Sequence, residues 1–230
     1  MIYISKLITP ISTGTAAGDI DVGATVKINE NGQAVEHIVV HQGLPSDIYD
    51  SSCEGTWCLR KDIAENRVWD SGNSNVLETS DIQAYLNGDW MNRYAHDVAE
   101  AIKQVKIPYR QNGGSGGTDR TGANGLQCKI FLLSGREVGL GSADNQYLPN
   151  DGAKLDYFID GTTSSANNRR IANLNGSATN WWLRSPATHN EVGVWRCNSG
   201  GDCDHWNAYN SYGVRPALIL PYSFKFKEVS

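Results

Sequence analysis

Hydrophobic and polar positions alternate near the start of the chain, in two runs that are separated by a turn dipeptide. Residues 25–29 (Thr-Val-Lys-Ile-Asn) and 35–41 (Val-Glu-His-Ile-Val-Val-His) are rich in β-branched side chains, and Asn31-Gly32 stands between them. β-Branched residues at a period of two favour strands, and Asn-Gly favours the positive φ angles of a tight reversal. The pattern predicts a β-hairpin over residues 25–41.

A helical period follows in the middle of the chain. Residues 79–88 offer N-capping side chains, then apolar residues at i, i+3 and i+4, then the stop signal Asn-Gly. This order predicts a helix, and residues 98–105 and 153–158 predict a second and a short third one. The apolar run at residues 129–133 predicts a buried strand. Helices in mid-chain with strands at both ends indicate an α+β fold.

Two apolar segments with one arginine each enclose a polar stretch near the C-terminus. Residues 181–186 and 212–220 are expected to be paired core strands. Between them, the 26 residues 187–212 hold four Asn, three Gly, two Trp, two Tyr and two His, but no Leu, Ile, Met, Phe or Lys. Rigid aromatic rings among small polar groups are typical of a paratope-like contact surface. A solvated polar β-meander is the plainer interpretation of the same composition.

Composition and charge narrow the classes of partner. The 230 residues suit one domain of generous size, and a net charge of −5 argues against sequence-independent nucleic-acid binding. No apolar run approaches the roughly 18 residues that a membrane span needs, so no membrane insertion is expected. The start lacks the basic and apolar regions of a signal peptide. Five cysteines leave one unpaired in any scheme, which argues against a dense disulfide framework.

The two apolar flanks carry a family resemblance. The frame WWLRSP at 181–186 with GVRPAL at 213–218 resembles phage and gut-bacterial proteins of C-type-lectin-like fold, some of which are diversified by retroelements. Shorter segments at 39–43, 102–109, 131–135, 151–155 and 174–179 extend the resemblance over about residues 22–222. It implies a C-type-lectin-like fold, in the variant of formylglycine-generating enzymes, with inserts. Residues 1–20 would form an arm or linker and residues 21–230 the ligand-binding domain.

The resemblance implies a non-catalytic receptor-binding protein without a cofactor or metal. Its partner would be a protein or glycan on a bacterial cell surface, and its location a phage tail or a bacterial cell surface, with a homotrimer as one assembly. In diversified relatives the asparagine codons are the mutable ones, so four asparagines would be unmutated positions and their neighbours substituted ones. The expected contact residues are Thr188, His189, Asn190, Trp195, Arg196, Asn198, Asp202, Asp204, His205, Trp206, Asn207, Tyr209, Asn210 and Tyr212. Among them, two tryptophans and two tyrosines would be the anchors, with the charged residues setting specificity.

Two other classes of function stay open. Formylglycine-generating enzymes share the broader fold and use two C-terminal cysteines, so Cys197 and Cys203 suggest a copper-dependent oxidase as an alternative. A structural tail protein whose polar surface binds nothing is the other. Calcium-dependent sugar binding is disfavoured, because Trp206-Asn207 is not followed by the acidic residue of the lectin motif.

The remaining chemical signals have plainer interpretations. His37 and His41 are spaced for a metal on one strand face, but no third ligand stands nearby, and we interpret them as ordinary strand histidines. Ser115 lies in a Gly-x-Ser-x-Gly match within the glycine-rich stretch 111–125. We interpret the stretch as a flexible surface loop and the match as chance. Arg184 and Arg215, in apolar frames, are expected to form buried ion pairs.

Overall fold

The computed structural model describes residues 2–4, 14–141, 146–159 and 168–228 of the chain. Strands account for 36% of the structure and helices for 15%, so the chain has a β-rich fold. The α+β, C-type-lectin-like fold expected from the sequence is therefore wrong as a fold class. The helices that the sequence suggested are short or absent, and most of the apolar periodicity belongs to strands.

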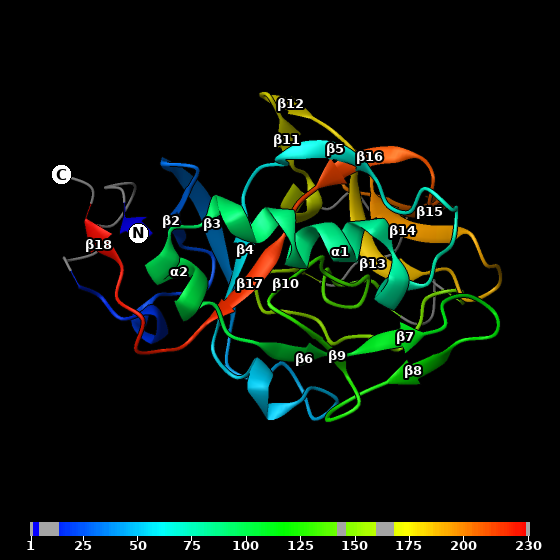
Figure 1. Ribbon diagram of the computed structural model, residues 1–230, viewed down its shortest axis with the longest axis horizontal. Helices are drawn as coiled ribbons and strands as arrows, with labels where there is room; N and C mark the ends of the chain where they lie inside the picture. Colours follow the sequence, from blue (N-terminus) through cyan, green and yellow to red (C-terminus); the bar gives the residue numbers. More distant parts are fainter. Residues whose placement is uncertain (1, 5–13, 142–145, 160–167, 229–230) are drawn as a thin grey trace.

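A seven-stranded sheet forms one part of the molecule (Figure 1). Its strand order is β10-β17-β4-β3-β2-β1-β18, and all of its pairs are antiparallel except β1 with β18. In this order the bounds are Ile130–Phe131, Ala217–Leu220, Thr56–Arg60, Gln33–Gln42, Thr25–Glu30, Ile2–Ile4 and Lys227–Glu228.

A five-stranded sheet carries the polar C-terminal segment. Its order is β15-β14-β13-β16-β5, so β15 and β5 are its edges. In this order the bounds are Cys203–Asn207, Gly193–Cys197, Trp181–Pro186, Ser211–Val214 and Glu65–Val68. Along the longest axis of the molecule, β18 and β2 lie toward one end and β14 and β15 toward the other (Figure 1).

Three two-stranded pairs and several short helices complete the described chain. The pairs are β6 (Val105–Ile107) with β9 (Leu126–Cys128), β7 (Tyr109–Gln111) with β8 (Thr118–Arg120), and β11 (Asn173–Leu174) with β12 (Ser177–Ala178). The α-helices are α1 (Asp81–Asn87) and α2 (His96–Ala101), and the 3₁₀ turns are Ala17–Asp19, Ser51–Cys53, Leu77–Thr79, Asp89–Arg93 and Asn168–Arg170. No helix in the described ranges is long and apolar enough to cross a membrane.

The first predicted hairpin is confirmed. Strands β2 and β3 pair antiparallel from Thr25 opposite Ile38 to Glu30 opposite Gln33. Asn31 and Gly32 form the reversal with φ angles of 52° and 79°, which is the left-handed region that this dipeptide tolerates. Local sequence alone therefore defines this part of the fold.

The predicted helices are confirmed only in part. Helix α1 begins where expected, and the Ser80 side chain caps it by accepting from the Gln83 N–H. The helix expected over 98–105 ends at Ala101, because Val105 is already in strand β6. No helix forms at 153–158: the Leu155 and Tyr157 N–H groups donate to the carbonyls of Glu137 and Val40, so tertiary hydrogen bonds replace helical ones.

Residues 111–125 are more structured than a surface loop. Strands β7 and β8 pair across the glycines, and both Gly113 and Gly114 are buried. A Cβ atom on Gly114 would lie only 1.9 Å from the Asn190 carbonyl oxygen, so glycine is required for this close approach. Ser115 is followed by strand β8 and not by the helix of a nucleophile elbow, in agreement with a chance match.

The described part of the expected N-terminal arm packs on the domain. Strand β1 pairs with β2 and with β18. Ala17 is fully buried, and its N–H donates to the Phe224 carbonyl. Residues 5–13 of the expected arm lie outside the described residues.

The two apolar C-terminal flanks do not form one simple pair of strands. Trp181 pairs in parallel with Gly213, but the chain leaves the sheet after Val214, and β17 continues in the seven-stranded sheet. Strands β13 and β14 of the five-stranded sheet are buried on both faces: Trp182 and Val194 belong to one core, and Trp181 and Trp195 to the other. Consecutive side chains of a strand face opposite ways, which explains the paired tryptophans at 181 and 182.

Candidate ligand-binding surface

Residues 187–212 form the β14–β15 hairpin and the turns on either side of it. The side chains of Trp206 and Tyr209 are 47% and 53% exposed, and His189 is also exposed. The expected contact residues that are partly exposed are Thr188, Asn190, Asn198, Asp202, Asp204, His205, Asn207, Asn210 and Tyr212. Trp195 and Arg196 are only 4% and 7% exposed, so the structure does not present Trp195 as the contact anchor that its sequence position suggested.

A charged and aromatic cluster occupies one face of the hairpin. The Arg196 guanidinium donates from Nε and Nη2 to the two carboxylate oxygens of Asp204, at 2.8 and 3.2 Å. Its central carbon lies 4.7 Å from the Trp206 ring centroid and 4.2 Å from that of Tyr212. The Trp206 indole N–H donates to the same carboxylate at 3.0 Å. We call Arg196, Asp204, Trp206 and Tyr212 the arginine cluster.

A second cluster of rings lies on the opposite face. The His205 ring is in edge contact with those of Trp195, Tyr147 and His189, with centroids 4.9–6.3 Å apart. Tyr147 and His189 lie closer still, with their centroids 3.9 Å apart. Burial lowers the pKa of His205, and the neighbouring His189 lowers it further, while Asp204 opposes the shift. His205 is therefore favoured in its neutral form.

Tyr147 is the member of this surface that sequence reasoning missed. It is 38% exposed, and its carbonyl accepts from the Thr188 N–H at 2.9 Å and from the Trp195 indole N–H at 3.4 Å. It lies 46 residues before the first residue of β14, in a loop without periodicity. No local signal links Tyr147 to the hairpin, because the link is a tertiary contact.

The asparagines of the segment shape its turns. The Asn190 side-chain oxygen accepts from the N–H groups of Val192 and Gly193, and that of Asn198 accepts from those of Gly200 and Asp202. The Asn210 side-chain amide donates to the Asn207 carbonyl at 3.0 Å. Asparagine favours turns because its side chain bonds nearby backbone groups. Turn formation accounts for these asparagines without any reference to mutable codons.

Asn75 is a further residue that the sequence did not point to. It is fully buried below the hairpin, and its side-chain amide donates to the carbonyls of Asn190 and Gly193 at 2.9 Å. Its side-chain oxygen accepts from the Gly114 N–H at 2.8 Å. Asn75 thereby fixes the turn before β14 against the glycine-rich segment.

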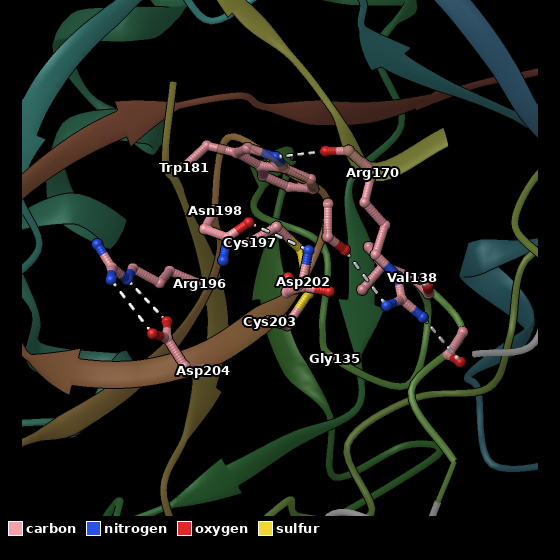
Figure 2. The surroundings of a disulfide bond; sticks show 12 residues. Gly135, Val138, Arg170, Trp181, Arg196, Cys197, Asn198, Asp202, Cys203 and Asp204 are labelled. Atoms are coloured by element: carbon pink, nitrogen blue, oxygen red, sulfur yellow. Dashed lines mark hydrogen bonds and ion pairs between the residues drawn. A yellow bond between two sulfur atoms is a disulfide. The ribbon is translucent and has the colours of Figure 1, made fainter. Parts of the chain in front are cut away.

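A disulfide closes the other end of the hairpin. Cys197 and Cys203 lie opposite each other on β14 and β15 and are bonded (Figure 2). Nearby, the Arg170 guanidinium reaches the carbonyls of Val138 and Gly139, and the Trp181 indole donates to the Arg170 carbonyl (Figure 2). Both cysteines are almost fully buried, at 0% and 3% exposure. The bonded pair does not offer the two accessible thiols that a copper oxidase of the formylglycine-generating kind would use.

The three other cysteines are free and buried, and burial raises the pKa of each thiol to about 12. A thiol with such a pKa is a weak nucleophile at neutral pH. Cys53 and Cys58, only five positions apart, are thus two free thiols of the core.

Arg184 forms the buried ion pair that the sequence predicted. Its two terminal nitrogens donate to the Glu137 carboxylate at 2.6 and 2.7 Å, and neither side chain is more than 1% exposed. The Tyr49 hydroxyl donates to the same carboxylate at 2.7 Å. Next to the pair, the Ser185 hydroxyl donates to Asp151 at 2.7 Å. Since the charges are paired and enclosed, this network positions β13 and does not face a ligand.

Arg215 does not form the buried ion pair that the sequence predicted for it. Its Nε donates to the Arg60 carbonyl at 2.9 Å, and its guanidinium lies 4.8 Å from the Trp181 ring centroid. Among the described residues no carboxylate pairs with it, and one of its terminal nitrogens has no hydrogen-bond partner. Burial lowers the pKa of Arg215 to about 10, so it is still a cation at neutral pH.

The two strand histidines have separate carboxylate neighbours. His37 lies 3.4 Å from Glu30, whereas His41 lies 2.8 Å from Asp156. A β-bulge between Val39 and His41 breaks the register of β3, so the i, i+4 rule for one strand face does not apply. In the described ranges, no three His, Cys, Asp or Glu side chains are grouped so that they could hold a metal ion.

The comparison with known families gives one result. Residues 54–222 match a family model described as a domain of unknown function, DUF6273. The match covers well over half of the chain and includes the five-stranded sheet, so the chain belongs to this family. No curated protein and no solved structure matches the chain.

Proposed function

We propose that this protein is a non-catalytic ligand-binding protein. It contacts a protein or glycan on a bacterial cell surface through the exposed side of the β14–β15 hairpin and the turn that follows it. The observation that carries the proposal is the exposure of Trp206 and Tyr209, at 47% and 53%, beside the arginine cluster. Large exposed aromatics are the residues that most often dominate binding energy at an interface. The resemblance of the WWLRSP and GVRPAL frame to diversified receptor-binding proteins adds support.

The position of the surface in the molecule also favours a binding role. Strands β14 and β15 lie at the opposite end of the long axis from β18 (Figure 1). An attachment near β18, to a phage tail or to a bacterial cell surface, would leave the hairpin facing outward. The disulfide, the Arg196–Asp204 pair and Asn75 hold the hairpin in one conformation, which reduces the entropy lost on binding.

Binding to whole bacteria tests the proposal. The fluorescently labelled protein is titrated onto a panel of gut bacteria and read by flow cytometry. Each of Trp206→Ala and Tyr209→Ala should weaken binding by roughly 2 kcal/mol, or about thirtyfold. Tyr222→Ala is the matched control, because Tyr222 is a 39% exposed aromatic whose hydroxyl bonds Glu54, outside this surface. Protease or periodate treatment of the cells separates a protein receptor from a glycan.

Two outcomes contradict the proposal. If the wild type binds no strain, or binds and tolerates both substitutions, the surface is not a receptor-binding one and a structural tail role is the better account. Sequencing of the source locus tests the narrower claim of diversification. A near-copy of the segment encoding residues 181–216, differing at adenines and next to a reverse transcriptase gene, is the expected result.

A further inference from the structure

Strand β15 is an open sheet edge. Only β14 pairs with it in the described structure, and it is five residues long. The other edges are shorter or covered: β10 and β18 have two residues each, and the side chains of β5 engage α1, with the Arg67 guanidinium 3.5 Å from the Tyr85 ring centroid. Edge strands are usually protected by Lys, Pro, a bulge or a covering segment. Strand β15 has no Lys or Pro, and it carries the exposed Trp206.

The register of the hairpin identifies the unpaired backbone groups. The Cys197–Cys203 pair has a Cα–Cα distance of 4.2 Å, which is typical of a pair that exchanges no hydrogen bonds. At the two ends of the hairpin, the Asn198 N–H donates to the Asp202 carbonyl at 2.7 Å, and the Ala208 N–H donates to the Val192 carbonyl at 2.8 Å. Because bonded and non-bonded pairs alternate, residues 204 and 206 bond to β14. The N–H groups of Cys203, His205 and Asn207 therefore point away from β14. Cys203 is only 3% exposed, so the accessible ones belong to the partly exposed His205 and Asn207.

We infer that β15 receives an extended, basic peptide segment of a partner protein as an antiparallel sixth strand. The inference rests on the proposed function and names the class of partner for that surface. Backbone hydrogen bonds to residues 205 and 207 would supply affinity that does not depend on sequence. Side chains of the added strand would alternate between the arginine cluster and the histidine face.

Charge determines the choice of a basic peptide. The acids of this part of the hairpin are Asp202 and Asp204, both partly exposed, with the Asp204 side chain 48% exposed. The cations next to them, Arg196 and Arg170, are 7% and 0% exposed. A Lys or Arg directly opposite Asp204 would meet a carboxylate and lie near the Trp206 ring, two favourable partners for a cation. In a second copy of this chain, β15 carries no Lys or Arg, so it would offer no cation to this edge.

The geometry gives a test with a built-in control. In antiparallel pairing, the peptide residues that bond to 205 and 207 have their side chains on the face of His205. In the acetylated peptide (Lys-Val)4, side chains alternate between the two faces. When the lysine side chains lie on the face of Asp204, the lysine N–H groups point away from β15 and the valine N–H groups bond to it. N-methylation of the valines should abolish binding, and N-methylation of the lysines should preserve it. Fluorescence anisotropy of labelled peptides with the full chain measures both.

A protein variant tests the same edge from the other side. His205→Pro removes an outward N–H without removing a bond to β14, which is where a strand tolerates proline. His205→Ala is its matched control for the lost imidazole. We expect His205→Pro to bind (Lys-Val)4 at least tenfold more weakly than His205→Ala. If His205→Pro does not fold, as judged by circular dichroism, Asn207→Pro against Asn207→Ala replaces it.

Several results would overturn the inference. They are failure of the wild type to bind (Lys-Val)4 at millimolar concentration, equal binding of (Glu-Val)4, or equal effects of the two N-methylation patterns. A wild-type dimer in sedimentation that His205→Pro dissociates would assign the edge to a second copy. Suppose that His205→Pro binds bacteria as well as His205→Ala does, and that Trp206→Ala loses this binding. The proposed function then stands and the strand addition is wrong. If the wild type binds the peptide but binds no bacteria, the strand addition stands and the proposed function is wrong.

Discussion

The guanidinium of Arg196 and the carboxylate of Asp204 face each other directly across the β14–β15 hairpin and share two hydrogen bonds. The two partners differ in exposure, because the Arg196 side chain is 8% exposed and that of Asp204 is 48% exposed. The pair therefore lies at the boundary between the protein interior and solvent. Its two members should respond differently to removal.

Asp204→Ala should destabilise the protein more than Arg196→Met. Without Asp204 the buried guanidinium keeps its charge and loses its partner, at a cost of about 2–3 kcal/mol in the free energy of unfolding. Arg196→Met removes the buried charge, keeps much of the packing, and leaves a carboxylate that water can solvate, so we expect a cost of about 1 kcal/mol or less. Urea denaturation of both variants measures the difference. Equal costs would contradict this account of the pair.

The disulfide should stabilise the hairpin by a modest amount. Cys197 and Cys203 are six positions apart, and closure of so short a loop is worth about 2 kcal/mol on the chain-entropy scale. We expect Cys197→Ala/Cys203→Ala to lose about that much free energy of unfolding. Dithiothreitol should lower the stability of the wild type but not that of the double variant, since the three remaining cysteines are already reduced. A double variant that still responds to dithiothreitol would indicate another disulfide.

Glu137→Gln should be among the most destabilising conservative substitutions. It leaves the fully buried Arg184 guanidinium without its ion-pair partner, while the side chain keeps nearly the same volume. Breaking one partner of a buried pair costs about 3–5 kcal/mol. Chemical denaturation should show this loss, with Glu191→Gln as the control at an exposed glutamate. A loss below about 1 kcal/mol would mean that the network tolerates an unpaired arginine.

Local signals predicted the parts of the fold that local interactions determine. The Asn31-Gly32 turn and the Ser80 cap both act within a few residues, and both are found as expected. The apolar spacing through Val105 resembled a helix, but pairing of β6 with β9 prevailed over the local preference. Hydrophobic periodicity does not say which distant segment will pair, so the fold class was predicted wrongly.

In the candidate surface, too, local signals predicted some features, and tertiary contacts determined the others. The composition of 187–212 suggested a segment outside the core, and Trp206 and Tyr209 are exposed, but all five residues of β14 are buried. Trp195 could not be distinguished from Trp206 by composition, because only the strand register turns one ring inward and the other outward. Tyr147 reaches the surface through a tertiary contact alone.

Asp151 should make stability fall as pH rises between about 4 and 7. Burial raises its pKa from 3.8 to about 7, against the opposing effect of Arg184. Below pH 4 the carboxyl group is protonated in both states; between these values the unfolded chain releases the proton while the folded chain retains it. Ionisation therefore favours unfolding across this window, by up to about 4 kcal/mol.

The comparison of wild type with Asp151→Asn isolates this effect from the other titrating groups. Asparagine can still accept the Ser185 hydroxyl hydrogen bond but does not ionise. The free energy of unfolding of the wild type minus that of the variant should decrease steadily from pH 4 to pH 7 and then level off. Urea denaturation at half-unit pH intervals measures the curve. A difference that stays constant would show that Asp151 ionises in the folded protein as an ordinary aspartate does, and one that increases with pH would show that folding lowers its pKa.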